Sequence, residues 1–122
     1  MTGARTVTVQ TIDQGAVTIA EPTWCSGHDG DAPQLLCDTG HIGARHTMTY
    51  EGLELATAAL VQDPFVVHSD RSVSVLVELG HLGHGLTPGE LDGLAAVLVD
   101  YAGTLRGLAR QLSTLPARGE GR

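Results

Sequence analysis

The residues most suited to chemistry form two short Cys/His pairs in one polar segment. Cys25-Ser-Gly-His28 has the spacing C-x2-H, and Cys37-Asp-Thr-Gly-His41 has the spacing C-x3-H, with eight residues between the pairs. Thiolate and imidazole are ligands that zinc prefers, and two short-spaced pairs can complete a tetrahedron around the ion. The sequence therefore predicts a zinc site made by Cys25, His28, Cys37 and His41.

The two cysteines of these pairs are the only ones in the chain. One disulfide or two free thiols are the alternatives to a metal site, but a reducing cytosol and the neighbouring histidines favour the metal. Four protein ligands would close the site and make it structural. Without Cys37, the ligands Cys25, His28 and His41 would leave a position open for water, or His46 could take the place of Cys37.

Two further features accompany the predicted site. His81-Leu-Gly-His84 is an H-x2-H pair that could chelate a metal or add a ligand, although a solvated loop is the simpler interpretation. Asp29, Asp31 and Asp38 lie close to the predicted ligands and could orient their imidazole rings. Ordinary turn formation is the simpler explanation of the same aspartates.

Composition restricts the class of protein. The 122 residues predict a single domain over residues 1–115 and a disordered tail over 116–122. Seven basic residues stand against 14 acidic ones, and the net charge of −7 argues against direct nucleic-acid binding and suits a protein partner with a basic surface. The chain has no long apolar run for a membrane span, and its first residues lack the apolar stretch of a secretory signal, so we expect a cytoplasmic protein.

The pattern of apolar residues predicts mainly strands before residue 80. Alternation in the first segments indicates a hairpin that turns at 13–15, and the segment 53–61 is ambiguous between helix and strand, with strand preferred. The predicted strands are 6–12, 17–20, 47–50, 53–61, 65–68 and 72–79. The segment 21–45 is rich in Gly, Asp and Pro, and an irregular segment of this length needs something to order it, which a metal would supply.

The last predicted element is a long helix. Thr87-Pro88-Gly89-Glu90 has an N-cap threonine, a proline at the first helical position and a glutamate that completes a capping box. Leucines then recur every seven residues to about residue 112, which fits a helix packed on a sheet or a homodimer through the C-terminal helix centred on Leu98, Leu105 and Leu112. The fold class predicted is α+β, with a small antiparallel sheet, an inserted Cys/His loop and one long C-terminal helix.

The order of these motifs resembles a family of small actinobacterial proteins known only as a domain of unknown function. The resemblance is carried by a P-x-W-C-x(2-3)-H loop, a His-x-Gly further along and an L-T-P-x-E helix start. The matching residues here are Pro22, Trp24, Cys25, His28, His41, Gly43, Leu86, Thr87, Pro88 and Glu90. The resemblance implies an origin in an actinobacterium or its phage and implies no activity.

A narrower resemblance concerns Cys37-Asp-Thr-Gly-His41, which is similar to the C-D-G-S-H motif of a small iron–sulfur family. That family binds a [2Fe–2S] cluster with three cysteines and one histidine, and Cys37 and His41 match its last two ligands. His28 stands where the family has a cysteine, and Cys25 is displaced by one position. The resemblance implies electron transfer as an alternative function.

The sequence as a whole predicts a zinc-stabilised, non-enzymatic protein-interaction or regulatory module. A zinc-dependent hydrolase with an open Cys/His site and an iron–sulfur electron-transfer protein are the two alternatives.

Overall fold

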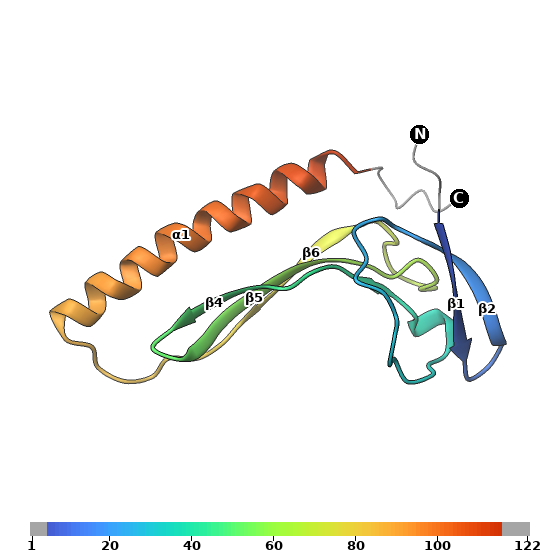
Figure 1. The fold of residues 1–122 in the computed structure, drawn as a ribbon, viewed down its shortest axis with the longest axis horizontal. Helices are drawn as coiled ribbons and strands as arrows, with labels where there is room; N and C mark the ends of the chain where they lie inside the picture. The colour runs from blue at the N-terminus through green and yellow to red at the C-terminus, as the bar shows by residue number, and fades with distance from the viewer. Residues whose placement is uncertain (1–4, 116–122) are drawn as a thin grey trace. The chain divides into compact units, whose positions relative to one another are not determined.

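The computed structural model describes residues 5–115. The predicted disordered tail at 116–122 lies outside these residues. The described part is α+β, with small antiparallel sheets and one long C-terminal helix (Figure 1), as predicted. It divides into two compact units, one formed by residues 5–44, 60–74 and 115 and the other by residues 45–59 and 75–114. Within residues 5–115, no helix has the combination of length and apolar character that crossing a membrane requires.

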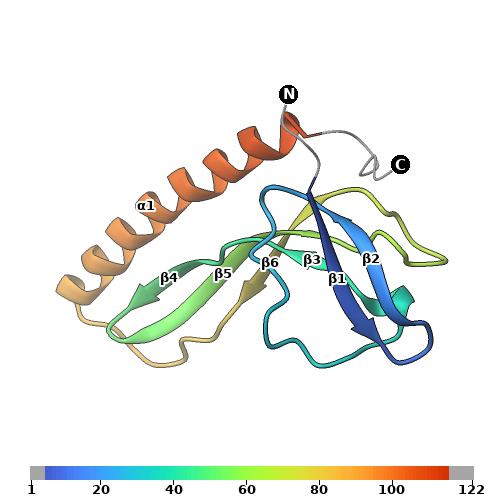
Figure 2. The same ribbon diagram turned by 45° about the vertical axis from the view of Figure 1, so that its right-hand side comes forward.

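The first unit begins with the predicted hairpin. Strand β1 (Arg5–Thr11) pairs antiparallel with β2 (Gly15–Glu21), so that Arg5 lies opposite Glu21 and Thr11 opposite Gly15 (Figure 2). Gly15 closes the turn with a φ of 68°, a conformation that glycine adopts without steric cost. Alternation along β2 buries Ile19 and Glu21 on the same face. The hairpin therefore ends with a carboxylate directed inward.

The segment after the hairpin is mostly irregular, as predicted. It contains the 3-10 helix η1 (Leu36–Asp38) and the two-residue strand β3 (His41–Ile42), which pairs antiparallel with the end of β5 (Leu53–Gln62). Backbone bonds tie it to its surroundings: Ile12 N–H donates to the Gln34 carbonyl at 2.8 Å, and Ser26 N–H donates to the Ile42 carbonyl at 2.9 Å.

The second unit contains a sheet in which β5 pairs with β4 (His46–Tyr50) and with β6 (Ser74–Leu79). The ambiguous segment 53–61 is therefore a strand. β4 and β5 are antiparallel, with a register shift between Met48 and Thr49, and Glu51 (φ 52°) and Gly52 (φ 80°) form their turn.

The predicted strand at 65–68 is wrong. These residues form a turn and a bend, with Val66 N–H bonded to the Asp63 carbonyl at 3.4 Å. Pro64 has its φ fixed at the second position of this turn, where proline is favoured. Arg71 Nε donates to the Val66 carbonyl at 2.8 Å and holds the bend. The local turn chemistry therefore overrides the apolar run Phe65-Val-Val67.

Helix α1 (Pro88–Ser113) confirms the predicted start. Thr87 is the N-cap, its side chain accepts from Glu90 N–H, and the Glu90 side chain accepts from Thr87 N–H. The helix buries Tyr101 and Leu108 in an apolar core whose other buried members are Met48, Tyr50, Leu55, Ala56 and Ala58. Leu105, placed in the predicted dimer seam, packs against this core, whereas Leu98 is 50% exposed.

Candidate metal centre

Four side chains of the first unit bring potential metal ligands together. Glu21, Cys25, His28 and His41 each offer one ligand atom, and these atoms all lie within 4.8 Å of one another. We call them the metal group. Glu21, Cys25 and His41 are buried, and His28 is partly buried. Carboxylate, thiolate and imidazole are all ligands of zinc in proteins, so this group could hold a metal ion.

Glu21 and His41 come from regular strands at the two ends of the irregular segment. Glu21 is the last residue of β2, and His41 is the first residue of β3. Oε1 of Glu21 lies 3.2 Å from Nδ1 of His41 and 2.9 Å from Nε2 of His28. One carboxylate oxygen thus lies beside a ring nitrogen of each histidine.

Cys25 and His28 come from a tight turn between those ends. Cys25 N–H donates to the Pro22 carbonyl at 3.1 Å, and Gly27 N–H donates to the sulfur of Cys25 at 3.4 Å. Gly27 has a φ of 101°, which only glycine adopts easily, and this conformation turns the chain back toward the sulfur. Sγ of Cys25 consequently lies 3.7 Å from Nε2 of His28.

Neighbouring residues hold this turn in place. Arg5 Nη2 donates to the carbonyls of Pro22 at 3.3 Å and Cys25 at 3.2 Å. The Trp24 ring meets the His41 ring edge-on, with centroids 6.2 Å apart. A Cβ atom on Gly43 would lie 3.0 Å from the carbonyl oxygen of Trp24, so a side chain there would push this segment away. Trp24 therefore anchors the loop beside the metal group.

The imidazole of His28 faces a carboxylate at each nitrogen. Nδ1 lies 3.2 Å from Oδ2 of Asp31, and Nε2 lies 2.9 Å from Oε1 of Glu21. A neutral imidazole has one N–H donor and one bare nitrogen, so it can donate to only one of them. If Nδ1–H donates to Asp31, the lone pair of Nε2 faces the Glu21 oxygen, and a cation between these two atoms would satisfy both. This is the usual arrangement of a metal-bound histidine, whose other nitrogen donates to a carboxylate.

The ring of His41 contains an unpartnered polar atom. The residue is only 3% exposed, and among residues 5–115 its Nδ1 has no hydrogen-bond partner, although Oε1 of Glu21 lies 3.2 Å away. Buried polar atoms normally have a partner, and an orphan calls for an explanation. A metal ion bound at Nδ1 would supply the missing interaction.

Burial shifts the pKa values of His41 and Cys25 in opposite directions. Burial lowers the pKa of His41, with repulsion from His28 in the same direction and the Glu21 charge opposing it, so the ring is held in the neutral form that binds metals. Burial raises the pKa of the Cys25 thiol and the Glu21 charge adds to this, whereas the Gly27 N–H lowers it. A metal would displace the thiol proton on binding.

The structure brings together three of the four predicted ligands and places Cys37 apart from them. Cys37 lies in η1, is partly buried, and its thiol has Oδ1 of Asp38 at 3.8 Å. Glu21 occupies the fourth position of the group instead. His46, His81 and His84 are exposed and do not belong to the group.

The sequence analysis missed Glu21 because it considered only cysteine and histidine as ligands and ended the predicted strand at residue 20. One signal was available: alternation from Val17 and Ile19 continues inward to Glu21 if the strand is extended by one residue, and Glu21 stands four residues before Cys25. An acidic residue at a buried strand position needs a partner, because an unpaired buried charge is costly.

Comparison with other proteins gives a family and no activity. No curated protein and no solved structure matches the chain. A family profile does match, over residues 6–114, and this range includes all of the hairpin except Arg5, the whole metal group and the N-cap of α1. The chain belongs to the family described as Domain of unknown function (DUF6907).

Proposed function

We propose that the protein is a zinc-stabilised, non-enzymatic interaction module in which Glu21, Cys25, His28 and His41 bind one zinc ion. The observation that carries the proposal is the convergence of four donor atoms within 4.8 Å, three of them on buried residues. The mixed set of one sulfur, two nitrogens and one oxygen suits zinc, which accepts all three donor types in a tetrahedral site. A thiolate and a carboxylate together also neutralise the charge of the ion.

A structural role follows from where the ligands lie in the chain. Glu21 and His41 delimit the irregular segment, and Cys25 and His28 lie inside it. A bound ion would therefore join both ends of this segment to its first turn. Binding to a site present only in the folded state adds to the stability of that state. Four protein ligands also leave no position for a substrate, which argues for a structural rather than a catalytic ion.

The donor set favours zinc over the iron–sulfur alternative. Clusters of the [2Fe–2S] type take at least two cysteines: four in the common type, two with two histidines in the Rieske type, and three with one histidine in the family that the C-D-T-G-H segment resembles. Cys25 is the one cysteine of the metal group, and Cys37 lies outside it. The net charge of −7 supports the further proposal that the module's protein partner has a basic surface.

One observation favours a zinc hydrolase as the second candidate. A pocket of about 240 Å³ is lined by His28 together with Gln10, Asp31 and Gln34. In this alternative Cys25, His28 and His41 bind the ion, and Glu21 acts as a general base toward a metal-bound water. The variant Glu21→Gln separates the two candidates. A structural ligand set would lose affinity for zinc, whereas a hydrolase would keep its zinc and lose hydrolytic activity.

Metal analysis of two matched cysteine variants tests the leading proposal. We expect one zinc per chain in the purified full-length protein, loss of zinc in Cys25→Ser, and retention of zinc in Cys37→Ser. Cobalt substitution should produce a thiolate charge-transfer band that only Cys25→Ser removes. Fluorescence of Trp24, the only tryptophan, should report binding because its ring contacts His41. Equal loss of zinc in both variants, or a wild type that takes up no zinc on refolding, would refute the assignment.

A further inference from the structure

Strand β6 forms an edge of the sheet in the second unit with little protection against pairing. It pairs with β5 on one side, and no strand within residues 5–115 pairs with its other side. Its sequence Ser-Val-Leu-Val-Glu-Leu has a single charge and no proline. Natural proteins usually protect such edges with lysine, proline or a covering segment, because unpaired backbone donors and acceptors attract another strand.

One face of β6 is apolar and remains largely uncovered. Val75 packs against the core, and alternation places Val77 and Leu79 on the same face. These two residues are nevertheless 45% and 80% exposed. Glu78 lies on the other face, where Oε1 is 3.4 Å from Oγ1 of Thr57 and 3.8 Å from Nη1 of Arg45.

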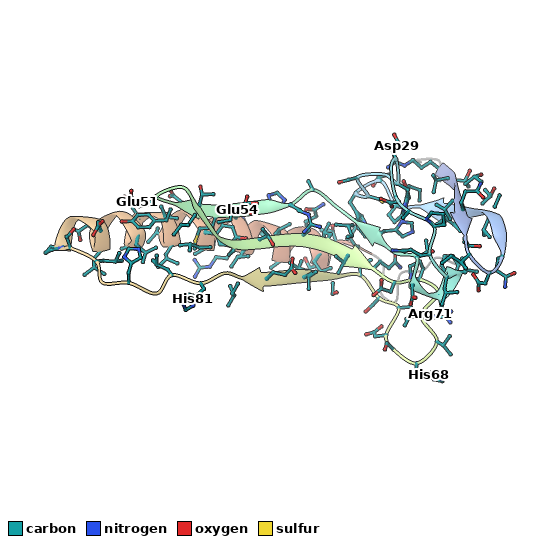
Figure 3. All side chains as sticks on the ribbon, turned by 90° about the horizontal axis from the view of Figure 1, so that it is seen from below. Asp29, Glu51, Glu54, His68, Arg71 and His81 are labelled. Carbon is teal, nitrogen blue, oxygen red and sulfur yellow. The ribbon has the colours of Figure 1, made fainter. Side chains whose placement is uncertain are left out.

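The position of α1 explains this exposure. Tyr101 donates from its hydroxyl to the His46 carbonyl at 2.7 Å, and Tyr50 donates to the Glu90 carbonyl at 2.5 Å, so two hydrogen bonds attach the helix to β4. Figure 3 shows α1 behind β4 and β5, with β6 along the opposite edge of the sheet. The helix therefore covers the β4 side and leaves the β6 side open.

The flank of α1 on this open side is also apolar. A Cβ atom on Gly93 would lie 3.3 Å from the ring of Tyr50, the last residue of β4. Gly93 therefore marks the side of the helix that faces β4. At 100° per residue, Leu91 and Leu98 lie roughly 140–160° around the helix from Gly93. They are 53% and 50% exposed. We call Val77, Leu79, Leu91 and Leu98 the β6–α1 strip.

We propose that a second copy of this chain covers the β6–α1 strip by pairing its own β6 antiparallel with this one. A two-fold axis perpendicular to the sheet reverses the strand without turning the sheet over. Both α1 helices then lie on the same face of the joined sheet, and both strips face the line where the two β6 strands pair. With the axis at Leu76, Val75 lies opposite Val77 of the second copy and Glu78 opposite its Ser74, so that like charges are not directly paired.

A second copy suits this surface better than a single peptide strand. A peptide would satisfy the backbone of β6 but would add no helix beside Leu91 and Leu98. A copy related by two-fold symmetry supplies a free strand edge and an apolar helix flank together, and both features are present on this chain. The interface is therefore self-complementary, as two-fold symmetry requires.

Two neighbouring leucine and valine positions on α1 provide a matched test. Leu98 belongs to the strip, whereas Val99, 72% exposed, lies roughly 100° further from it around the helix. In light scattering of the full-length, zinc-loaded protein, we expect a dimer for the wild type and Val99→Glu and a monomer for Leu98→Glu and Val77→Lys. A lysine that points inward from an edge strand blocks pairing without disrupting the sheet.

Hydrogen exchange of the wild type provides a measurement that does not depend on any variant folding. The outward amides of β6 should exchange more slowly as protein concentration rises. Three outcomes would overturn the proposal: a monomeric wild type at high concentration, a dimer that persists in Val77→Lys, or β6 exchange that is independent of concentration. Zinc content should be the same in all these variants, so this result and that of the metal proposal are distinguishable.

Discussion

His28 directs Nδ1 toward the carboxylate of Asp31, three residues further along the chain, at 3.2 Å from Oδ2. The Asp31 N–H in turn donates to the His28 carbonyl at 3.0 Å, so the pair is fixed by a backbone turn as well as by the side chains. Asp31 is thus the outer partner that would fix which nitrogen of His28 binds the metal.

This relationship predicts that Asp31→Asn weakens zinc binding although Asp31 is not a ligand. Loss of such an outer partner typically lowers metal affinity about 10–100-fold. Competition with a chromophoric chelator would measure the change. Asp29→Asn is the matched control, because Asp29 is also exposed and acidic and lies outside the metal group. Equal effects of the two substitutions would show that only net charge matters.

The turn at Gly27 predicts a second effect on zinc binding. Gly27→Ala places a side chain at a φ of 101°, and strain of this kind costs about 1–3 kcal/mol. Relief of the strain would move the Gly27 N–H away from the Cys25 sulfur, so we expect weaker zinc binding and a lower melting temperature. Gly52→Ala, at a φ of 80° in the β4–β5 turn, should lower stability without changing zinc affinity. Unchanged zinc affinity in Gly27→Ala would contradict this role.

The capping box of α1 predicts a defined cost for loss of the cap. Thr87→Ala removes the acceptor of the Glu90 N–H and should lower the free energy of unfolding by about 1 kcal/mol. Denaturant unfolding followed by circular dichroism would measure it. Thr87→Ser keeps the hydroxyl oxygen and should retain most of the stability. A neutral result for Thr87→Ala would mean that water replaces the cap at no cost.

The same box predicts a dependence of stability on pH. Hydrogen bonds from the backbone and side chain of Thr87 lower the pKa of Glu90 below its ordinary value of 4.5. A carboxyl group with a lowered folded-state pKa stabilises the protein above its unfolded pKa, and that contribution is lost as pH falls through the folded-state value. The stability difference between wild type and Glu90→Gln should therefore shrink as pH falls below about 4.5. Thermal melts would measure this difference. A difference that stays constant across that pH range would contradict a contribution from the ionised carboxylate of Glu90 to the capping box.

Most of the fold could be predicted from the sequence because the patterns that indicate its strands and helix are local. Alternation identified β1 and β2, and Thr87 with Pro88 and Glu90 identified the start of α1. The strand predicted at residues 65–68 is wrong because an apolar run does not reveal that Pro64 lies in a turn. The sequence also could not predict which side of α1 remains exposed. Leu98 and Leu105 belong to the same heptad pattern, and only packing on the sheet distinguishes them.

The sequence by itself determined that Cys25, His28 and His41 belong to a candidate metal site, because residue type and short spacing are local properties. Only the tertiary structure decided the fourth member. Glu21 enters the group because β2 ends with an inward-facing position beside β3, and Cys37 stays outside because η1 holds it elsewhere. Spacing along the chain cannot contain this information, since distances between segments are set by strand pairing and burial rather than by the number of residues between them.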